Sequence, residues 1–190
     1  MATRDKVREE LRSQQQAFRA WWEGDRREPF HLPNHPFFCL CDVLYPPFWP
    51  LLRYHLRVAW VSLANFLPLP ALKVVMLRWA GAKIGKNVYI SPGAIIDPLY
   101  PANVTLEDDV LLGLKCCLLT HEVTATGYRV ARVTVKAGAV IGAFAVVRSG
   151  VTVGCRAQVG CLSFVNRDVP DGATVGGVPA RPLNAAGTEG

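Results

Sequence analysis

The second half of the chain repeats itself every six residues. From residue 84 onward an aliphatic residue opens each unit, and a small residue or valine usually follows four positions later. A period of six fits neither the 3.6-residue turn of an α-helix nor the two-residue alternation of a strand. It fits a short flat strand followed by a turn, repeated many times. The opening residues are Ile84, Ile90, Ile96, Leu106, Leu112, Leu118, Val135, Ile141, Val147, Val153, Val159 and Val165.

Three such units make one triangular coil, and stacked coils can hydrogen-bond as parallel strands. We expect the aliphatic residue and the small residue of each unit to point inward. The period is broken twice, by four extra residues after Ile96 and by eleven after Leu118. Both insertions follow the third unit of a triplet, so they leave the prism at the same corner. Insertions on one face of a repeat array commonly build the binding site.

The first part of the chain has a different character, and we divide the sequence accordingly. We expect a helical, Pro- and aromatic-rich extension over residues 1–80, with helices at 4–27, 51–66 and 71–80 joined by an irregular connector at 29–50. The β-helix of about four coils then covers residues 81–172. The remaining residues, 173–190, are expected to cap its open end. The fold class is therefore mainly β, with an α-helical N-terminal extension.

The net charge of +6 comes from residues 43–96, which contain no Asp or Glu. Aliphatic residues and prolines separate the basic ones, so nucleic acid is a poor partner. The uncharged stretch 58–72 is too short, and too interrupted by proline, to span a membrane. Two interpretations stay open: these helices pack on the β-helix or on a neighbouring subunit, or they lie on a membrane surface. The basic residues concerned are Arg53, Arg57, Lys73, Arg78, Lys83 and Lys86.

Cysteine usage points to a reducing compartment. The six cysteines are few for a disulfide scaffold, and the charged, Gln-rich first 20 residues do not resemble a signal peptide. We therefore expect a cytoplasmic protein with free thiols. Cys39 and Cys41 are spaced as metal ligands could be, but no second pair with zinc-finger spacing follows them. Buried thiols are the alternative to a metal site there, and we expect no metal.

Four stretches of sequence together resemble a known family. They are residues 81–88, the Leu-Leu-Thr-His-Glu run at 118–122, the unbroken repeats at 135–169, and the closing segments 168–172 and 176–181. They look like the hexapeptide-repeat acyltransferases, most of all the bacterial sugar and polysaccharide O-acetyltransferases. The resemblance implies a left-handed parallel β-helix and acyl transfer from acetyl-CoA. One departure is Val140, at a position where sugar acetyltransferases often carry an aromatic residue, so the acceptor pocket is expected to differ.

The resemblance assigns the general base to His121. Imidazole suits the task, because removing a hydroxyl proton near neutral pH needs a base with a pKa in that range. Asp97 is the expected substrate-binding carboxylate, where it would orient either the acceptor sugar or the imidazole. Glu122 is the second catalytic candidate, which would hold His121 in the correct tautomer or else be a solvated loop acid. No Ser-His-Asp or Cys-His pattern occurs, so we expect direct transfer without an acyl-enzyme.

The resemblance also implies where acetyl-CoA, the acyl donor, would bind. Small residues would let its pantetheine arm approach the coils, and polar or basic residues would contact its other parts. For the glycines, simple crowding at the corners of the coil is the alternative explanation. The residues concerned are Gly142, Ala143, Gly160, Cys161, Asn166, Arg167 and Arg181.

The family further implies a homotrimer with its active sites between subunits. The predicted function is thus acetyl-CoA-dependent O-acetylation of a sugar hydroxyl, on a saccharide, a nucleotide sugar or a lipid-linked glycan. The alternatives are N-acetylation of an amino sugar or an antibiotic, and a non-catalytic β-helix scaffold. A membrane-linked glycan would place the protein at the inner face of the cell membrane, with residues 43–96 toward the lipid. The sequence does not name the acceptor.

Overall fold

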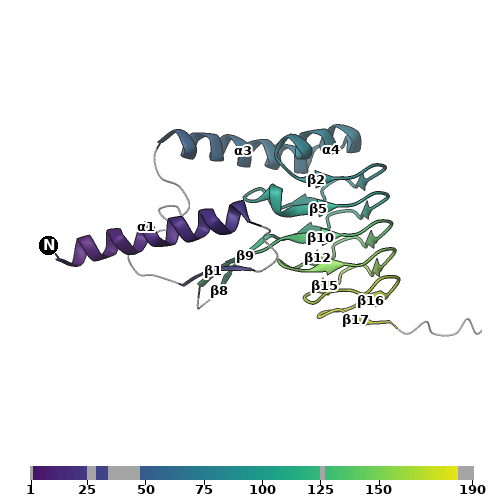
Figure 1. The fold of residues 1–190 in the computed structure, drawn as a ribbon. Helices are drawn as coiled ribbons and strands as arrows, with labels where there is room; N and C mark the ends of the chain where they lie inside the picture. Colours follow the sequence, from purple (N-terminus) through teal and green to yellow (C-terminus); the bar gives the residue numbers. More distant parts are fainter. Residues whose placement is uncertain (1, 25–28, 34–47, 125–126, 184–190) are drawn as a thin grey trace, which may run out of the picture.

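The computed structural model describes residues 2–24, 29–33, 48–124 and 127–183. Its main body is a stack of triangular coils whose strands form three parallel sheets, named here I, II and III (Figure 1). Sheet I consists of β2 (Lys83–Ile84), β5 (Val104–Leu106), β10 (Val133–Val135) and β13 (Thr152–Val153). Sheet II contains β3 (Tyr89–Ile90), β6 (Leu111–Leu112), β11 (Val140–Ile141), β14 (Gln158–Val159), β16 (Thr174–Gly176) and the antiparallel β17 (Arg181–Pro182). Sheet III consists of β4 (Ile95–Ile96), β7 (Cys117–Leu118), β12 (Val146–Val147) and β15 (Phe164–Val165).

The strand register confirms the six-residue repeat and both of its interruptions. In sheet I, Ile84 pairs with Leu106, Leu106 with Val135, and Val135 with Val153. The other two sheets keep the same offsets. Both insertions therefore leave the coil where the chain passes from sheet III to sheet I of the next coil. We call this edge of the prism the III–I corner, and name the other two edges in the same way.

The interior of the prism follows the predicted pattern. The aliphatic residues that open the units are buried with at most a few per cent of their surface exposed, apart from the half-buried Ile84. The alanines four positions later, among them Ala94, Ala139, Ala145 and Ala157, are fully buried. The narrow corner favours small side chains there, although Val110 and Val151 are also buried at this position. One contiguous core thus runs the length of the stack.

The turns of the coil share one backbone feature. The fourth residue of a unit commonly has a positive φ, a conformation that costs most residues free energy and that recurs here once per turn. Gly93, Gly138 and Gly150 meet this requirement without strain, but large side chains also occupy it. The non-glycine residues with positive φ are Asn87, Asp109, Lys115, Phe144, Arg156 and Leu162.

The eleven-residue insertion folds into a hairpin of β8 (His121–Thr124) and β9 (Gly127–Val130). The strand β1 (Phe30–Pro33) joins it on the outer side of β9. This corrects the expectation of an irregular connector at 29–50, as far as that segment is described. The edge of a hairpin can accept a further strand, and Pro33 is tolerated because it ends β1 at the edge of the sheet. The shorter four-residue insertion contains the 3₁₀ turn Pro101–Asn103.

In the described ranges before the coils, the helices have bounds that differ slightly from expectation: α1 (Ala2–Glu23), α3 (Phe48–Phe66) and α4 (Pro70–Trp79). Helix α1 ends early because Gly24 follows it, with a backbone N–H that donates to Ala20 O at 3.1 Å. Pro70 does not break a helix but begins α4, since a proline in the first turn lacks only an N–H that would be unpaired anyway. No helix in the described ranges is long and apolar enough to cross a membrane.

Helices α3 and α4 lie across the first coil and cover its open end (Figure 1). The Asn65 side chain acts as an extra strand partner: its Nδ2 donates to Ile96 O at 2.8 Å, and its Oδ1 accepts from Ile96 N at 3.1 Å. Lys73 is fully buried, and its Nζ donates to Ala94 O at 2.6 Å and Asn65 O at 3.2 Å. Lys73 is thus not available to a lipid surface, contrary to its place among the basic residues of 43–96.

At the other end, the segment expected to cap the stack begins by extending it. Val175 of β16 pairs with Val159, and β17 then turns back antiparallel to β16. Residues 184–190, and the candidate metal-ligand pair Cys39 and Cys41, lie outside the described residues.

Candidate functional site

His121 and Asp97 meet at the III–I corner. His121 is the first residue of β8, and its Nδ1 lies 2.5 Å from Asp97 Oδ2. The imidazole is about one quarter exposed, whereas the Asp97 side chain is completely buried. Because Nδ1 faces the carboxylate, it carries the proton and Nε2 is left as the proton acceptor. A buried carboxylate, an imidazole and an outward nitrogen are the parts that a general base needs.

The coil register explains why two residues so far apart in sequence come together. Ile96 and Leu118 are paired in sheet III, so the residues that follow them leave the same corner on adjacent coils. The Asp97 N–H donates to Leu118 O at 3.2 Å, which continues the ladder by one residue. Thr120 then donates to Asp97 Oδ2 through both its N–H, at 2.9 Å, and its Oγ1, at 2.7 Å.

Asp97 is ionised in spite of its burial. Burial alone would raise the pKa of this carboxyl, but the hydrogen bond and the charge of His121, together with the two Thr120 donors, outweigh it and lower the pKa. The backbone N–H of Leu99 donates to the other oxygen at 3.0 Å. A carboxylate held by four hydrogen bonds is a rigid partner for an imidazole. The geometry therefore favours orientation of the imidazole over contact with an acceptor sugar as the role of Asp97.

Glu122 faces away from His121. Neighbouring residues of a strand point to opposite sides, so Glu122 cannot share the partner of His121, and the structure gives the place beside the imidazole to Asp97. Arg148 donates to the Glu122 carboxylate through Nε, at 2.9 Å, and Nη2, at 2.8 Å, and Ser149 Oγ donates at 2.6 Å. Arg129 on β9 lies 3.5 Å away.

These contacts give Glu122 an anchoring function. Burial alone would raise the pKa of Glu122, but the hydrogen bonds from Arg148 and Ser149 and the charges of Arg148 and Arg129 outweigh it and lower the pKa. Arg148 and Ser149 follow β12 at the III–I corner of the next coil. The Glu122 carboxylate thus fastens the hairpin that carries His121 to the prism.

Two tyrosines flank the imidazole. The ring centroid of Tyr100 lies 6.0 Å from that of His121, in an edge-to-face arrangement, and that of Tyr128 lies 5.7 Å away. Both tyrosines are buried, and they come from the two insertions. Their own ring centroids are only 6.4 Å apart, so both tyrosines pack beside the imidazole and keep water away from that part of it.

The residues expected to bind acetyl-CoA fall into three places. Gly142, Ala143, Gly160 and Cys161 lie at the II–III corner, between β11 and β12 and between β14 and β15. This is a different edge of the prism from the one that carries His121. Within one chain, therefore, the structure does not bring the two groups together.

Crowding alone accounts for one of these glycines. A Cβ on Gly142 would lie 2.6 Å from both Cys161 N and Val159 O, so only glycine lets the coils stack there. Gly160 is different, because the nearest atom to its Cβ would be Val175 O at an ordinary 3.4 Å. Cys161 is an exposed thiol.

Cys116, in contrast, is buried inside the prism. Burial raises the pKa of Cys116 to about 12, which leaves that thiol protonated and unreactive.

Asn166 and Arg167 lie at the III–I corner, after β15, on the same edge of the prism as His121 but further along the stack. Arg181 begins β17 at the far end and is exposed. Its Nη1 donates to its own neighbour, Ala180 O, at 2.8 Å.

Sequence reasoning missed several contributors to the site. Thr120 stands in the quoted Thr-His-Glu run, but nothing there indicated that it would donate twice to Asp97. Tyr100 carried a signal, since it is a large residue at a position where the other units have small ones. No feature of the sequence pointed to Arg148, because its partner Glu122 lies in an insertion outside the repeat.

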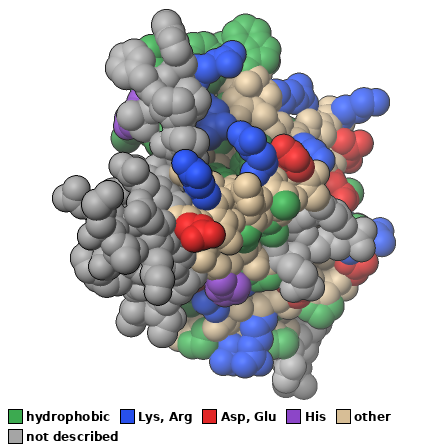
Figure 2. Space-filling view, turned by 60° about the vertical axis from the view of Figure 1, so that its left-hand side comes forward, with side chains coloured by type: hydrophobic (Ala, Val, Ile, Leu, Met, Phe, Trp, Pro, Cys, Tyr) green, Lys and Arg blue, Asp and Glu red, His purple; other side chains and the backbone are tan. Residues whose placement is uncertain are grey.

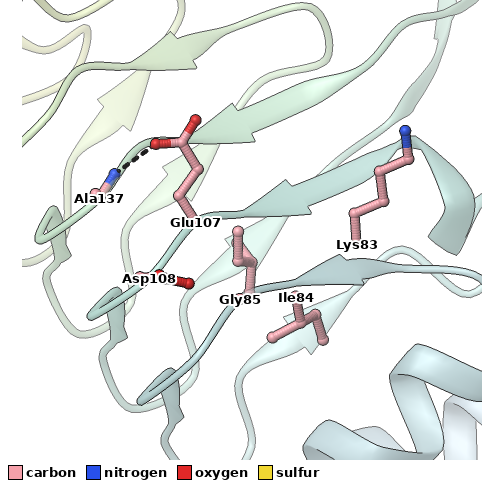
Figure 3. Close-up of a pocket in the computed structure, with 7 residues that line it drawn as sticks. Lys83, Ile84, Gly85, Glu107, Asp108 and Ala137 are labelled. Atoms are coloured by element: carbon pink, nitrogen blue, oxygen red, sulfur yellow. Dashed lines mark hydrogen bonds between the residues drawn. The ribbon is translucent and has the colours of Figure 1, made fainter.

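A cavity of about 530 Å³ elsewhere on the prism has no comparable chemistry (Figure 3). It lies at the I–II corner, between Lys83, Glu107 and Asp108. Both carboxylates are engaged by backbone: Ala137 N donates to Glu107 at 3.0 Å, and Lys86 N donates to Asp108 at 2.7 Å. These acids cap the turns of neighbouring coils. Within the described part of the chain, no group of three or more His, Cys, Asp or Glu side chains could hold a metal ion.

The fold and the site together define a class: a prism of six-residue repeats with a buried carboxylate–imidazole pair at the corner that both insertions leave. No protein-family model matches the sequence. YvoF of Bacillus subtilis (strain 168), described provisionally as an acetyltransferase, is 29% identical over 133 residues, which are 70% of this chain and 77% of YvoF. A 2,3,4,5-tetrahydropyridine-2,6-dicarboxylate N-acetyltransferase of Staphylococcus aureus (strain Newman) is 34% identical over 106 residues, 54% of this chain and only 32% of that protein.

Solved structures share the architecture. A hexapeptide-repeat acetyltransferase of Vibrio cholerae O1, complexed with acetyl-CoA, superposes with a TM-score of 0.60 at 23% identity, over 70% of this chain and 87% of that one. A galactoside acetyltransferase in complex with coenzyme A gives a TM-score of 0.58 at 20% identity, over 74% and 84% of the two chains. The expected left-handed β-helix is the fold that these neighbours imply. The chain is thus similar in fold to a hexapeptide-repeat acetyltransferase and in sequence to proteins described as acetyltransferases.

Proposed function

We propose that the protein is an acetyl-CoA-dependent O-acetyltransferase that acts on a sugar hydroxyl. The observation that carries this proposal is the His121–Asp97 pair, with Nδ1 on a buried carboxylate and Nε2 left to accept a proton. The activity is consistent with a relative described as an acetyltransferase and with two structural neighbours solved with acetyl-CoA or coenzyme A.

The reaction needs only one proton acceptor. His121 Nε2 takes the proton of the acceptor hydroxyl while the oxygen attacks the thioester carbonyl carbon. Asp97 stabilises the imidazolium that forms, as a buried carboxylate beside an imidazole does in other acyl-transfer sites. The tetrahedral intermediate then collapses: the carbon–sulfur bond breaks, the acetyl group stays on the acceptor oxygen, and the sulfur leaves with the proton held by His121. No acyl-enzyme forms.

The acyl donor would lie along the coils. In this proposal Gly142, Ala143, Gly160 and Cys161 allow its pantetheine arm to approach the backbone at the II–III corner. Asn166 and Arg167, on the corner of His121, and Arg181 at the end of the stack would contact its polar and phosphate groups.

A homotrimer would bring these two corners together. The II–III corner carries exposed apolar side chains at Leu114, Phe144 and Leu162, flanked by exposed Ile95 and Leu111 on the adjoining sheets. Several large apolar side chains exposed along one corner of the prism favour burial of that corner against another subunit. In such a trimer the donor-binding corner of one subunit would face His121 of the next, and each site would be complete only between subunits.

N-acetylation is the second candidate function. It is favoured by the Staphylococcus aureus relative, an N-acetyltransferase, whose 34% identity covers about half of this chain but a third of its own length. The likeness in fold to a galactoside acetyltransferase supports a sugar acceptor instead. The chemistry at His121 is the same in both cases, because an amine must also lose a proton to the base.

The test is the variant His121→Ala, compared with His31→Ala, which removes an exposed histidine from β1 of the same three-stranded sheet. Both proteins are incubated with labelled acetyl-CoA and a panel of sugars and amino sugars, and the products are separated. We expect the His121 variant to lose about 10²–10⁴-fold in turnover, the usual contribution of a general base. The control keeps full activity, and both keep the same oligomeric size. Undiminished acetyl transfer by a correctly assembled His121→Ala protein would contradict the proposed mechanism.

We further propose that the protein works in the cytoplasm, with its α3–α4 end against the inner face of the membrane. Large apolar side chains are exposed on both helices, above all Phe66, at 85%, and Trp79, at 76%. The other large hydrophobic residues exposed on these helices or on the link between them are Leu52, Leu56, Trp60, Leu63, Leu69, Leu72 and Val75. Figure 2 shows hydrophobic side chains along its upper edge, where these helices lie, with basic side chains close below them. Aromatic and basic residues beside an apolar face are typical of helices that lie in a lipid interface.

A further inference from the structure

We propose that a small aromatic cavity beside His121 binds the phosphate-bearing part of a phosphorylated sugar, with Arg57 as the residue that selects for phosphate. The inference rests on the proposed function, because it names the class of acceptor for the same site.

Three separate parts of the chain build this cavity. Its walls are Phe18 and Trp22 from α1, Arg57 from α3, and Tyr100 from the four-residue insertion. The volume is about 170 Å³. Pockets that enclose drug-sized ligands measure roughly 300–1,000 Å³, so this one has room for a single sugar ring or a phosphate group. A long glycan would have to extend out of it.

Tyr100 connects the cavity to the candidate base. Its ring centroid lies 6.0 Å from that of Trp22, which also lines the cavity, and 6.0 Å from that of His121. Phe18 approaches the same tyrosine edge-on at 6.4 Å. A sugar ring against these aromatic faces would thus be held one ring away from His121. That separation suits an acceptor whose reacting hydroxyl and whose recognised group lie at opposite ends of a sugar.

Arg57 supplies the charge. Its Nη2 donates to Leu99 O at 3.2 Å, which fixes the guanidinium in place, and the guanidinium carbon lies 5.8 Å from the Tyr54 ring. Its Nε is buried without a hydrogen-bond partner within the described residues. A buried donor without a partner is costly, and an anion beside the guanidinium, which lines the cavity, would offset that cost through its charge.

Among the described residues that line the cavity, none carries a negative charge that could compete for Arg57. Phe18, Trp22 and Tyr100 are uncharged, and Asp97 nearby is fully buried behind His121 and already accepts four hydrogen bonds. A guanidinium is the side chain best matched to phosphate, since it offers two parallel donors with a fixed charge. The arrangement therefore fits a sugar phosphate ester. Both a nucleotide sugar and a lipid-linked sugar diphosphate contain that chemistry.

Binding measurements test the inference without depending on turnover. The probes are glucose 1-phosphate and free glucose, titrated by calorimetry or NMR into the wild-type protein and into Arg57→Gln. Arg53→Gln is the matched control, because it removes the same charge from an exposed position one turn earlier on α3. We expect the wild type and the control to prefer the phosphorylated sugar about tenfold or more, as charged hydrogen bonds allow, and Arg57→Gln to lose that preference.

Two additional variants guard against a merely structural effect. Arg57→Lys keeps the charge but not the paired donors, so it should retain only part of the preference. Trp22→Leu should weaken both probes alike, because it removes a wall and no charge. Competition by UDP-glucose and by farnesyl diphosphate then distinguishes the nucleotide source of the phosphate from the lipid one.

The two proposals can fail separately. Equal binding of both probes by the wild type, or an unchanged preference in Arg57→Gln, overturns the cavity assignment even if His121→Ala abolishes acetyl transfer. Full transfer by His121→Ala overturns the proposed mechanism whatever Arg57 does.

Discussion

At the scale of single residues, the site depends on one buried carboxylate. Asp97 accepts hydrogen bonds from the His121 ring and from Thr120 and Leu99, all of which lie close to the III–I corner. It therefore has two roles: it holds the short insertion in place, and it determines which imidazole nitrogen carries the proton. Removing the charge of Asp97 should disturb the position of the imidazole proton much more than the anchoring of the insertion.

We therefore expect Asp97→Asn to fold and assemble but to transfer acetyl groups slowly. An asparagine can donate its amide N–H to Nδ1, and this would place the imidazole proton on Nε2, where it blocks the base. We expect turnover to fall by about a hundredfold or more, the range seen when a buried orienting carboxylate is neutralised. Steady-state kinetics with labelled acetyl-CoA checks this.

The control for Asp97 is Glu122, the carboxylate next to His121 in the sequence. Glu122→Gln should loosen the anchor to Arg148 and Ser149 and lower thermal stability, with a smaller effect on turnover, because Glu122 does not contact the imidazole. In Asp97→Asn the KM for the acceptor should stay near the wild-type value while kcat falls. A rise in KM with unchanged kcat would show that Asp97 contacts a substrate and does not position the base.

At the scale of elements, α3 and α4 close the first coil with polar groups. Lys73 Nζ is buried against main-chain carbonyls, and burial lowers the pKa of this lysine to about 8. The charge interaction with Cys116 acts in the opposite direction but is the smaller effect. In the unfolded chain the pKa is near 10.5. Between these values the unfolded chain binds more protons than the folded one, so the free energy of unfolding increases with pH.

This difference predicts an alkaline gain in stability. From about pH 8 to about pH 10.5, the wild type should become more stable relative to Lys73→Met, by up to about 3 kcal/mol if the whole difference in pKa is expressed. Below pH 8 both states carry the charge, and the difference between the two proteins should be constant. Urea unfolding of both proteins at several pH values measures this. Parallel pH dependence of the two would show that Lys73 is not held as the structure has it.

The sequence predicted the coil but not the contacts between the coil and the segments that precede it. The coil was predictable because each unit buries the same kind of residue, and the pairing of Ile84 with Leu106 follows from counting residues along the repeat. The burial of Lys73 was not, because a lysine within an apolar helix gives no sign of which carbonyls it will meet. The pairing of β1 with β9 depends on a contact between residues almost a hundred positions apart, and no local pattern encodes such a contact.

The site divides in the same way. His121 and Asp97 were singled out from the motif and the resemblance, but the choice between Asp97 and Glu122 as the partner of the imidazole needed the strand geometry. The aromatic cavity could not be predicted, because it forms only where α1 packs on Tyr100. Segments that meet only in the folded protein leave no spacing in the sequence.

At the scale of the whole molecule, the apolar and the chemical surfaces occupy different parts of the prism. The exposed apolar helices lie at the end where the stack begins, while β8, which begins at His121, projects from its side (Figure 1). A cyclic trimer with its axis along the stack would turn all three α3–α4 pairs toward the same plane. Such an arrangement would multiply a weak lipid contact threefold and leave the sites open at the sides.

We therefore predict that the protein binds vesicles of equal parts phosphatidylglycerol and phosphatidylcholine more tightly than vesicles of phosphatidylcholine alone, and that added salt weakens the binding. Replacing Phe66 and Trp79 together by serine should reduce binding about tenfold or more, because each large side chain contributes roughly 1.5–3 kcal/mol when it leaves water. Leu183→Ser, at the opposite end of the stack, is the control and should bind as the wild type does. Sedimentation with the vesicles measures the bound fraction. If the double variant binds equally well but changes its oligomeric size, the apolar face is a contact between copies of the chain and not a lipid surface.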